Sequence, residues 1–192
     1  MKPPTALATA ERIVSYLEGP GHRGDPAAHL DIQVNGAQLL CDPGEADLPT
    51  EMQRAALRYW QGLPRVGGIP DQLKVDPEAL RPALGYLMLV DRLEGSCEFR
   101  YALYGSKIAA VSGFDMTGQT VSDIATLDEI RIFFAACYQA VIALRQPLFT
   151  VHEAPRSITV SHWHRLILPL GQQGEVRRFL VCNVPIHEGQ IV

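Results

Sequence analysis

The sequence contains little of what several function classes require. No apolar run approaches the roughly twenty residues that cross a bilayer. The only cysteines are Cys41, Cys97, Cys137 and Cys182, which lie far apart with no C-x-x-C pair. A membrane span, a zinc ribbon and a redox dithiol are therefore not indicated. We expect reduced, small and mostly buried cysteines.

Positive charge is also scarce. The chain has 17 Lys and Arg against 21 Asp and Glu, a formal net charge of −4, and Arg177–Arg178 is its only adjacent basic pair. A nucleic-acid-binding surface needs clustered basic residues, so nucleic acid is a poor candidate partner. Met1–Pro4 is too proline-rich to begin a signal peptide. We expect a cytoplasmic protein without membrane contact.

Apolar residues, by contrast, are plentiful. They make up 47% of the 192 residues, which is ample for a packed core. We expect one domain over residues 50–192, preceded by an N-terminal extension over residues 1–49. In the extension, Thr9–Glu18 has the apolar spacing of a short helix. Alternating apolar residues on both sides of Asn35–Gly36 predict a β-hairpin over residues 30–41.

Two longer helices are expected in the main domain, besides short ones such as the one that Asp76 and Pro77 are expected to begin. Thr50 and Gln53 have the spacing of a capping box and precede an amphipathic stretch of about three turns that ends near Gly62. Leu127–Leu144 is the longest helical pattern, and Pro147 prevents its continuation. Each of these helices has one apolar face, which must pack on another element.

The strand patterns fall into two groups. Three segments are apolar at both odd and even positions, as expected of central strands that are covered on both faces. They are Tyr86–Val90, Leu166–Leu170 and Phe179–Ile186. Cys97–Tyr104 and Leu148–Val151 with its flanks are mixed, as expected of edge strands. The patterns therefore predict three central strands and two edge strands.

The segment 99–124 changes period several times. Phe99, Tyr101 and Leu103 alternate with Arg100, Ala102 and Tyr104 as in a strand with one buried face, and Gly105 ends that strand. Ser106 is expected to cap a short helix, which Gly113 ends by adopting a left-handed conformation. Strand, short helix, turn and second short helix follow one another within 26 residues.

This order resembles the PAS domain, and more narrowly a bacterial single-domain PAS variant with an "FxYRLxGT…GxDLTG…LPL" pattern. The positions that carry the resemblance are Phe99, Arg100, Tyr101, Leu103, Gly105, Ser106, Ile108, Gly113, Asp115, Met116, Thr117 and Gly118, with Tyr59, Trp60, Asp76, Pro77, Leu87, Leu89 and Asp91 upstream and Leu166–Leu170 downstream. The resemblance covers about the last two thirds of the chain.

The resemblance implies an α+β fold. Its five-stranded antiparallel sheet would have the order 2-1-5-4-3, which makes the first, fourth and fifth strands central, in agreement with the apolar patterns. The long helix would roof a cavity on one sheet face. N-terminal helices or a dimer partner would cover the other face. Family likeness by itself assigns no ligand or reaction.

Apolar and soft side chains are the candidates for the lining of such a cavity. The ligand-binding candidates are Phe99, Tyr101, Phe133, Phe134, Cys137, Tyr138 and Trp163. The same residues can instead fill the cavity, because a small domain needs an aromatic core. No cofactor is predicted: the long helix has no histidine for haem, and Cys137 or Tyr138 as an iron ligand competes with simple packing.

His162 and His164 are the remaining chemical candidates. Two residues apart on a strand, they project from one face and can share a metal or a ligand. No supporting carboxylate or cysteine lies at a local spacing, so solvated histidines are the stronger interpretation and no metal site is predicted. Ser106 lacks the G-x-S-x-G context of a nucleophile, so no catalytic residue is predicted.

These observations favour a sensory or regulatory module that acts through protein contacts. We expect a homodimer and an unidentified signalling protein as partners, with gating by a small apolar or amphipathic ligand left open. The alternatives are an enzyme or carrier for a small hydrophobic molecule, with His162 or His164 as base, and a metal-binding regulator that uses the same histidines.

Overall fold

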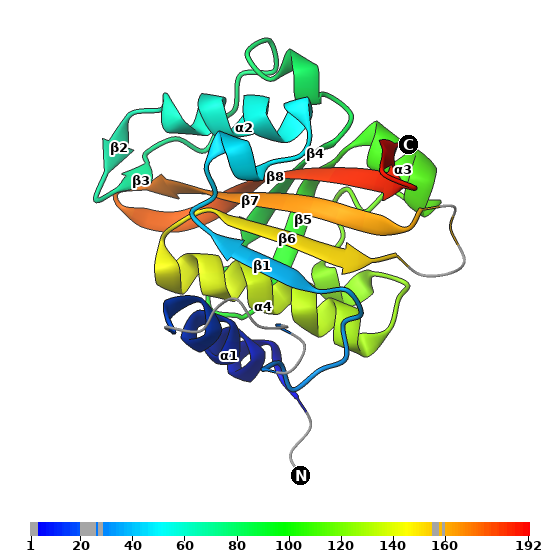
Figure 1. Cartoon of the computed structure of the whole chain (residues 1–192). Coiled ribbons are helices and arrows are strands. Elements are labelled where there is room, and N and C mark those ends of the chain that lie inside the picture. Colours follow the sequence, from blue (N-terminus) through cyan, green and yellow to red (C-terminus); the bar gives the residue numbers. More distant parts are fainter. Residues whose placement is uncertain (1–3, 20–25, 27–28, 155–157, 159) are drawn as a thin grey trace.

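The computed structural model describes residues 4–19, 26, 29–154, 158 and 160–192. Its helices lie on both sides of one large sheet, with α2 above the sheet and α4 and α1 below it in Figure 1. The α-helices are α1 (Ala6–Glu18), α2 (Glu51–Gln61), α3 (Ser106–Ser112) and α4 (Asp128–Leu144). The strands are β1 (Gln38–Cys41), β2 (Arg65–Val66), β3 (Ile69–Pro70), β4 (Leu87–Arg92), β5 (Phe99–Tyr104), β6 (Leu148–Glu153), β7 (His162–Gln172), β8 (Glu175–His187) and β9 (Gln190–Ile191).

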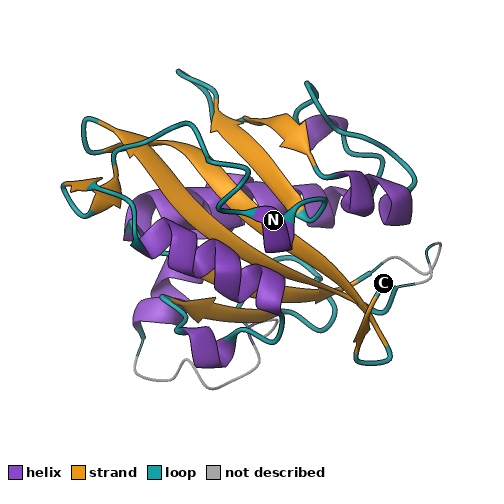
Figure 2. Cartoon of the chain, turned by 90° about the horizontal axis from the view of Figure 1, so that it is seen from above, coloured by secondary structure: helices purple, strands orange, loops and turns teal. Residues whose placement is uncertain are grey.

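The large sheet is antiparallel and has the order β1-β6-β7-β8-β4-β5, with β9 paired to β8. β2 and β3 form a separate two-stranded sheet. The expected α+β class with a large antiparallel sheet is therefore confirmed. β7 and β8, the longest strands, lie in the middle, and Figure 2 shows helices in front of and behind the strands.

The predicted hairpin over residues 30–41 is wrong. Only its second half is a strand, β1, and residues 30–37 form a turn and irregular structure. Leu30, Ile32 and Val34 are buried in the core instead of pairing with β1. The alternation does mark buried side chains, but these belong to the core that also contains residues of α1 and α4, and not to a hairpin.

β1 pairs with β6 instead. β6 is therefore not an edge strand, contrary to the prediction. Leu39 lies opposite Thr150, and the amide of Glu153 donates to the carbonyl of Asn35. β6 is buried along most of its length as a result. Its mixed sequence pattern reflects the polar residues that it places in the core, and not exposure at a sheet edge.

Two cores lie on the two faces of the sheet. One lies between the sheet and α4, with α1 packed on the outer side of α4 (Figure 1). The other lies between the sheet and α2. Thr50 accepts from the amide of Gln53 to begin α2, and the indole of Trp60 donates to the carbonyl of Pro169 at 2.7 Å. Of the two N-terminal helices, only α2 covers the second sheet face.

Gly105 joins β5 to α3. It is the N-cap of α3, whereas the predicted cap Ser106 is the first helical residue and makes no capping bond. A Cβ atom on Gly105 would lie 2.3 Å from the carbonyl oxygen of Gly85. Gly113 ends α3 with φ 83°, as predicted. Glycine at position 105 is therefore required by close backbone contact.

Candidate functional site

The seven predicted cavity residues lie between the sheet and α4. All except the half-buried Phe134 are buried. They come from three elements: Phe99 and Tyr101 from β5, Phe133, Phe134, Cys137 and Tyr138 from α4, and Trp163 from β7. The long helix thus supplies more of this set than either strand.

Aromatic rings fill one end of this layer. The ring centroids of Phe99 and Tyr138 are 5.0 Å apart, and both rings contact Phe179. At the other end, Phe133 and Phe134 both contact His152. Trp163 makes none of these ring contacts in the described part of the chain. Four of the seven candidates therefore fall into two aromatic groups, and Tyr101 contacts Tyr104 instead.

Arg165 lies between these groups and is only 1% exposed. Its Nη2 donates to the hydroxyl of Tyr138 at 2.8 Å, and its guanidinium lies 4.1 Å from the centroid of the Phe134 ring. Nη1 has no hydrogen-bond partner within the described ranges. No Asp or Glu among the described residues forms an ion pair with it. Because arginine keeps its charge in proteins, the core holds an uncompensated cation.

Two further polar residues flank Arg165 in the sheet. In register, Thr150 of β6 and Asn183 of β8 lie directly opposite it. Residues directly opposite each other in antiparallel strands project to the same face. Thr150 and Asn183 are 0% and 7% exposed. In the part of the chain that the structure describes, Oγ1 of Thr150 and Oδ1 of Asn183 have no hydrogen-bond partner. The three residues form a buried polar row across three strands.

His152 extends the row along β6. It lies two residues beyond Thr150, on the same face, and is 2% exposed. No described residue forms a hydrogen bond with its Nδ1. Burial lowers the pKa of His152 well below its ordinary value, and the positive charge of Arg165 lowers that pKa further. The imidazole is therefore neutral at pH 7. We call Thr150, His152, Arg165 and Asn183 the Arg165 cluster.

The other ionisable neighbours are neutral too. Burial raises the pKa values of Tyr101 and Tyr138, and raises the pKa of Cys137 to about 12. The two hydroxyls and the thiol therefore keep their protons at pH 7. Arg165 supplies the only net charge among these groups, and it is positive.

The lowered pKa of His152 predicts that the stability of the protein depends on pH. Since its pKa is lowered in the folded state, the unfolded state binds the proton first as pH falls. The free energy of unfolding should decrease below about pH 6.5, by up to about 1.4 kcal/mol per pH unit. Urea unfolding of wild type and His152→Gln between pH 7.5 and 5 tests this: the variant should show a flatter dependence. Equal slopes would contradict the assignment.

The two predicted chemical histidines lie elsewhere. His162 and His164 share the parity of Leu166, which faces α2, and the ring of His164 contacts Phe149 in that second core. Burial lowers the pKa of His164. Within the described residues, no group of three His, Cys, Asp or Glu side chains could hold a metal ion. The sheet thus separates both histidines from the Arg165 cluster.

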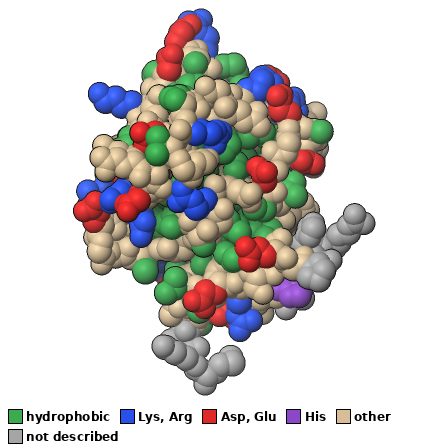
Figure 3. All heavy atoms as spheres, turned by 90° about the vertical axis from the view of Figure 1, so that its left-hand side faces the viewer, with side chains coloured by type: hydrophobic (Ala, Val, Ile, Leu, Met, Phe, Trp, Pro, Cys, Tyr) green, Lys and Arg blue, Asp and Glu red, His purple; other side chains and the backbone are tan. Residues whose placement is uncertain are grey.

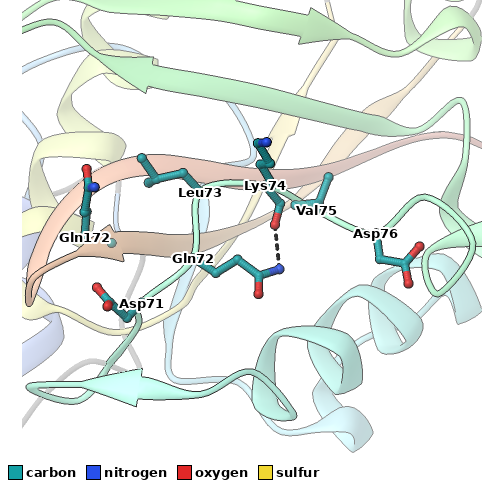
Figure 4. Close-up of a pocket in the computed structure, with 8 residues that line it drawn as sticks. Asp71, Gln72, Leu73, Lys74, Val75, Asp76 and Gln172 are labelled. Carbon is teal, nitrogen blue, oxygen red and sulfur yellow. Dashed lines mark hydrogen bonds between the residues drawn. The ribbon is translucent and has the colours of Figure 1, made fainter.

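Two surface hollows contain none of the predicted residues. One is an open hollow lined by residues 71–76 with Gly171 and Gln172. Figure 4 shows that Gln72 donates to the carbonyl of Lys74, so part of its polar lining is used within the loop. The other lies beside Arg177, which is ion-paired with Glu94 and Glu175. Neither combines buried polar groups with an unpaired charge.

Sequence reasoning missed the Arg165 cluster. The apolar pattern was counted only from Leu166, one residue after Arg165, although His162 and His164 were already placed on a strand and β7 begins at His162. Joining the two segments would have placed Arg165 at the parity of Ile167, which faces α4. A charged residue at an inward position is the signal that could have identified it. Thr150 and Asn183 carry no such signal, because only strand register places them beside Arg165.

Comparison with known proteins gave one match. Residues 49–183 match a family model described as a PAS domain. No curated protein and no solved structure matches the chain significantly. None of the helices described is long and apolar enough to span a membrane. The match covers well over half of the chain and includes every member of the Arg165 cluster.

Proposed function

Because this chain belongs to the PAS domain family, whose fold suggests a sensory or regulatory role, we propose that it is a sensor. Its signal is a small molecule that binds between the sheet and α4. Its output is a changed contact with another protein chain, either a second copy of itself or a signalling partner.

The observation that carries the proposal is the Arg165 cluster. A buried polar group without a partner costs free energy, and a buried unpaired charge costs more. Four side chains of this kind on one sheet face destabilise the ligand-free domain. Such a cost is expected where the groups serve binding, because ligand pockets combine an apolar lining with a few convergent polar groups.

A protein partner fits the surface better than nucleic acid. On the face shown in Figure 3, acidic and basic side chains are interspersed among apolar ones, without a large patch of one sign. Exposed apolar side chains include Leu84, Leu103 and Leu127. The enzyme or carrier alternative, with His162 or His164 as base, is less favoured because these side chains lie on the opposite face of the sheet from the cluster.

Native mass spectrometry tests the proposal. Freshly purified protein should carry the additional mass of a bound small molecule, or should gain such a mass when a small molecule is added. Binding should change either the number of subunits in the assembly or the amount of a partner protein that it binds. A matched absorption spectrum would show any chromophore. A protein that stays monomeric, binds no small molecule and captures the same partners under all conditions would contradict the proposal.

A further inference from the structure

We infer that the Arg165 cluster recognises a small hydroxylated monocarboxylate. The inference rests on the proposed function, since it assumes that the layer between the sheet and α4 takes a ligand, and it specifies the chemistry of that ligand. The Nη1 atom of Arg165 and the hydroxyl of Thr150 would donate to the carboxylate. The Oδ1 atom of Asn183 would accept from the hydroxyl of the ligand.

Charge decides the first part of this assignment. Among the described residues, Arg165 supplies the positive charge of this cluster, and its tyrosine, thiol and imidazole neighbours are neutral at pH 7. A ligand with a single negative charge neutralises it. A cation would be repelled, and a dianion would leave one negative charge buried without a partner.

Hydrogen bonding decides the second part. A hydrogen bond between a guanidinium and a carboxylate is charge-assisted and therefore strong. Nη2 of Arg165 donates to Tyr138, which leaves Nη1 of Arg165 and the hydroxyl of Thr150 as donors for the two carboxylate oxygens. Oδ1 of Asn183 is an acceptor that lacks a donor among the described residues. An ionised carboxylate cannot donate a hydrogen bond to it, whereas a hydroxyl group can.

Packing restricts the size of the ligand. Phe134 stacks on the guanidinium of Arg165 at 4.1 Å and contacts the ring of His152 at 5.2 Å. Phe133, which is fully buried, contacts the ring of Phe134. These rings already occupy the layer beside Arg165, so the site favours a molecule of few carbon atoms.

Titration calorimetry at constant ionic strength tests the inference with four probes. Glycolate carries the carboxylate and the hydroxyl, acetate lacks the hydroxyl, glycolamide lacks the charge, and inorganic phosphate has the wrong shape and charge. Glycolate should bind tightest, acetate about tenfold or more weaker, and glycolamide and phosphate should show no saturable binding. Glycolamide binding as tightly as glycolate, or no binding of either carboxylate, would overturn the inference.

Variants locate the binding. Arg165→Gln should weaken glycolate binding by about 100-fold or more. Arg178→Gln is the matched control, because Arg178 is paired with Asp91 and lies outside the cluster; its glycolate affinity should equal that of wild type. Equal affinity of Arg165→Gln and wild type would overturn the inference.

A second readout does not depend on the folding of Arg165→Gln. Magnetic resonance of wild type with ¹³C-labelled glycolate should show contacts between the ligand and the ring of Tyr138; contacts only at the surface would overturn the inference. If the cluster binds glycolate without a change in subunit count or partner capture, the proposed sensory function fails and this inference stands. If a neutral molecule alone binds and changes those contacts, the inference fails and the sensory function stands.

Discussion

Ligand-free protein with Arg165→Met should be more stable than wild type. Methionine keeps the long apolar stem and removes the buried charge. Even a buried ion pair can often be replaced by apolar residues of similar volume with a gain of up to about 1–4 kcal/mol, and Arg165 lacks the oppositely charged partner of such a pair. The lost bond to Tyr138 should offset about 1 kcal/mol of that gain. We therefore expect a net increase in the free energy of unfolding.

Urea unfolding at pH 7 in buffer without carboxylates measures this effect. Thr150→Val, which removes a buried hydroxyl whose oxygen has no partner, is a second variant with the same expected direction and a smaller size. Loss of about 3–5 kcal/mol in Arg165→Met would contradict the prediction, since it would show that Arg165 holds the core together. Wild type should approach the variant in stability when a ligand saturates it.

Gly105→Ala should destabilise the protein by more than about 4 kcal/mol, or prevent folding. A Cβ atom there would lie 2.3 Å from the carbonyl oxygen of Gly85 and 2.8 Å from that of Leu87. Both obstacles are backbone atoms, which cannot rotate away as a side chain can. Relief requires that β4 and the start of α3 separate, with loss of the bond from the Lys107 amide to Gly85.

Gly44→Ala is the matched control for Gly105→Ala. Gly44 also has negative φ, and an added Cβ would approach only a side-chain oxygen of Asp47, at 3.5 Å. Its free energy of unfolding should change by less than about 1 kcal/mol. A similarly small change in Gly105→Ala would show that the approach of the two backbones is not required by the fold.

Local sequence patterns were sufficient for most elements. The long helix, the amphipathic helix after Thr50 and the turn of α3 at Gly113 follow from periodicity, capping and the conformational freedom of glycine, which act over a few residues. The same locality explains the error at residues 30–41. Alternation shows that one side of a segment is buried, but it does not show which strand, if any, is its partner.

The candidate site was only partly accessible to sequence reasoning. The sequence by itself determined that an apolar layer with aromatic side chains would lie between the long helix and the sheet. The tertiary structure decided that this layer contains a charge, because strand register places Thr150 and Asn183 opposite Arg165 across 15 and 18 residues of chain. Whether a polar side chain is paired depends on neighbours that are distant in the chain, and folding alone brings them together.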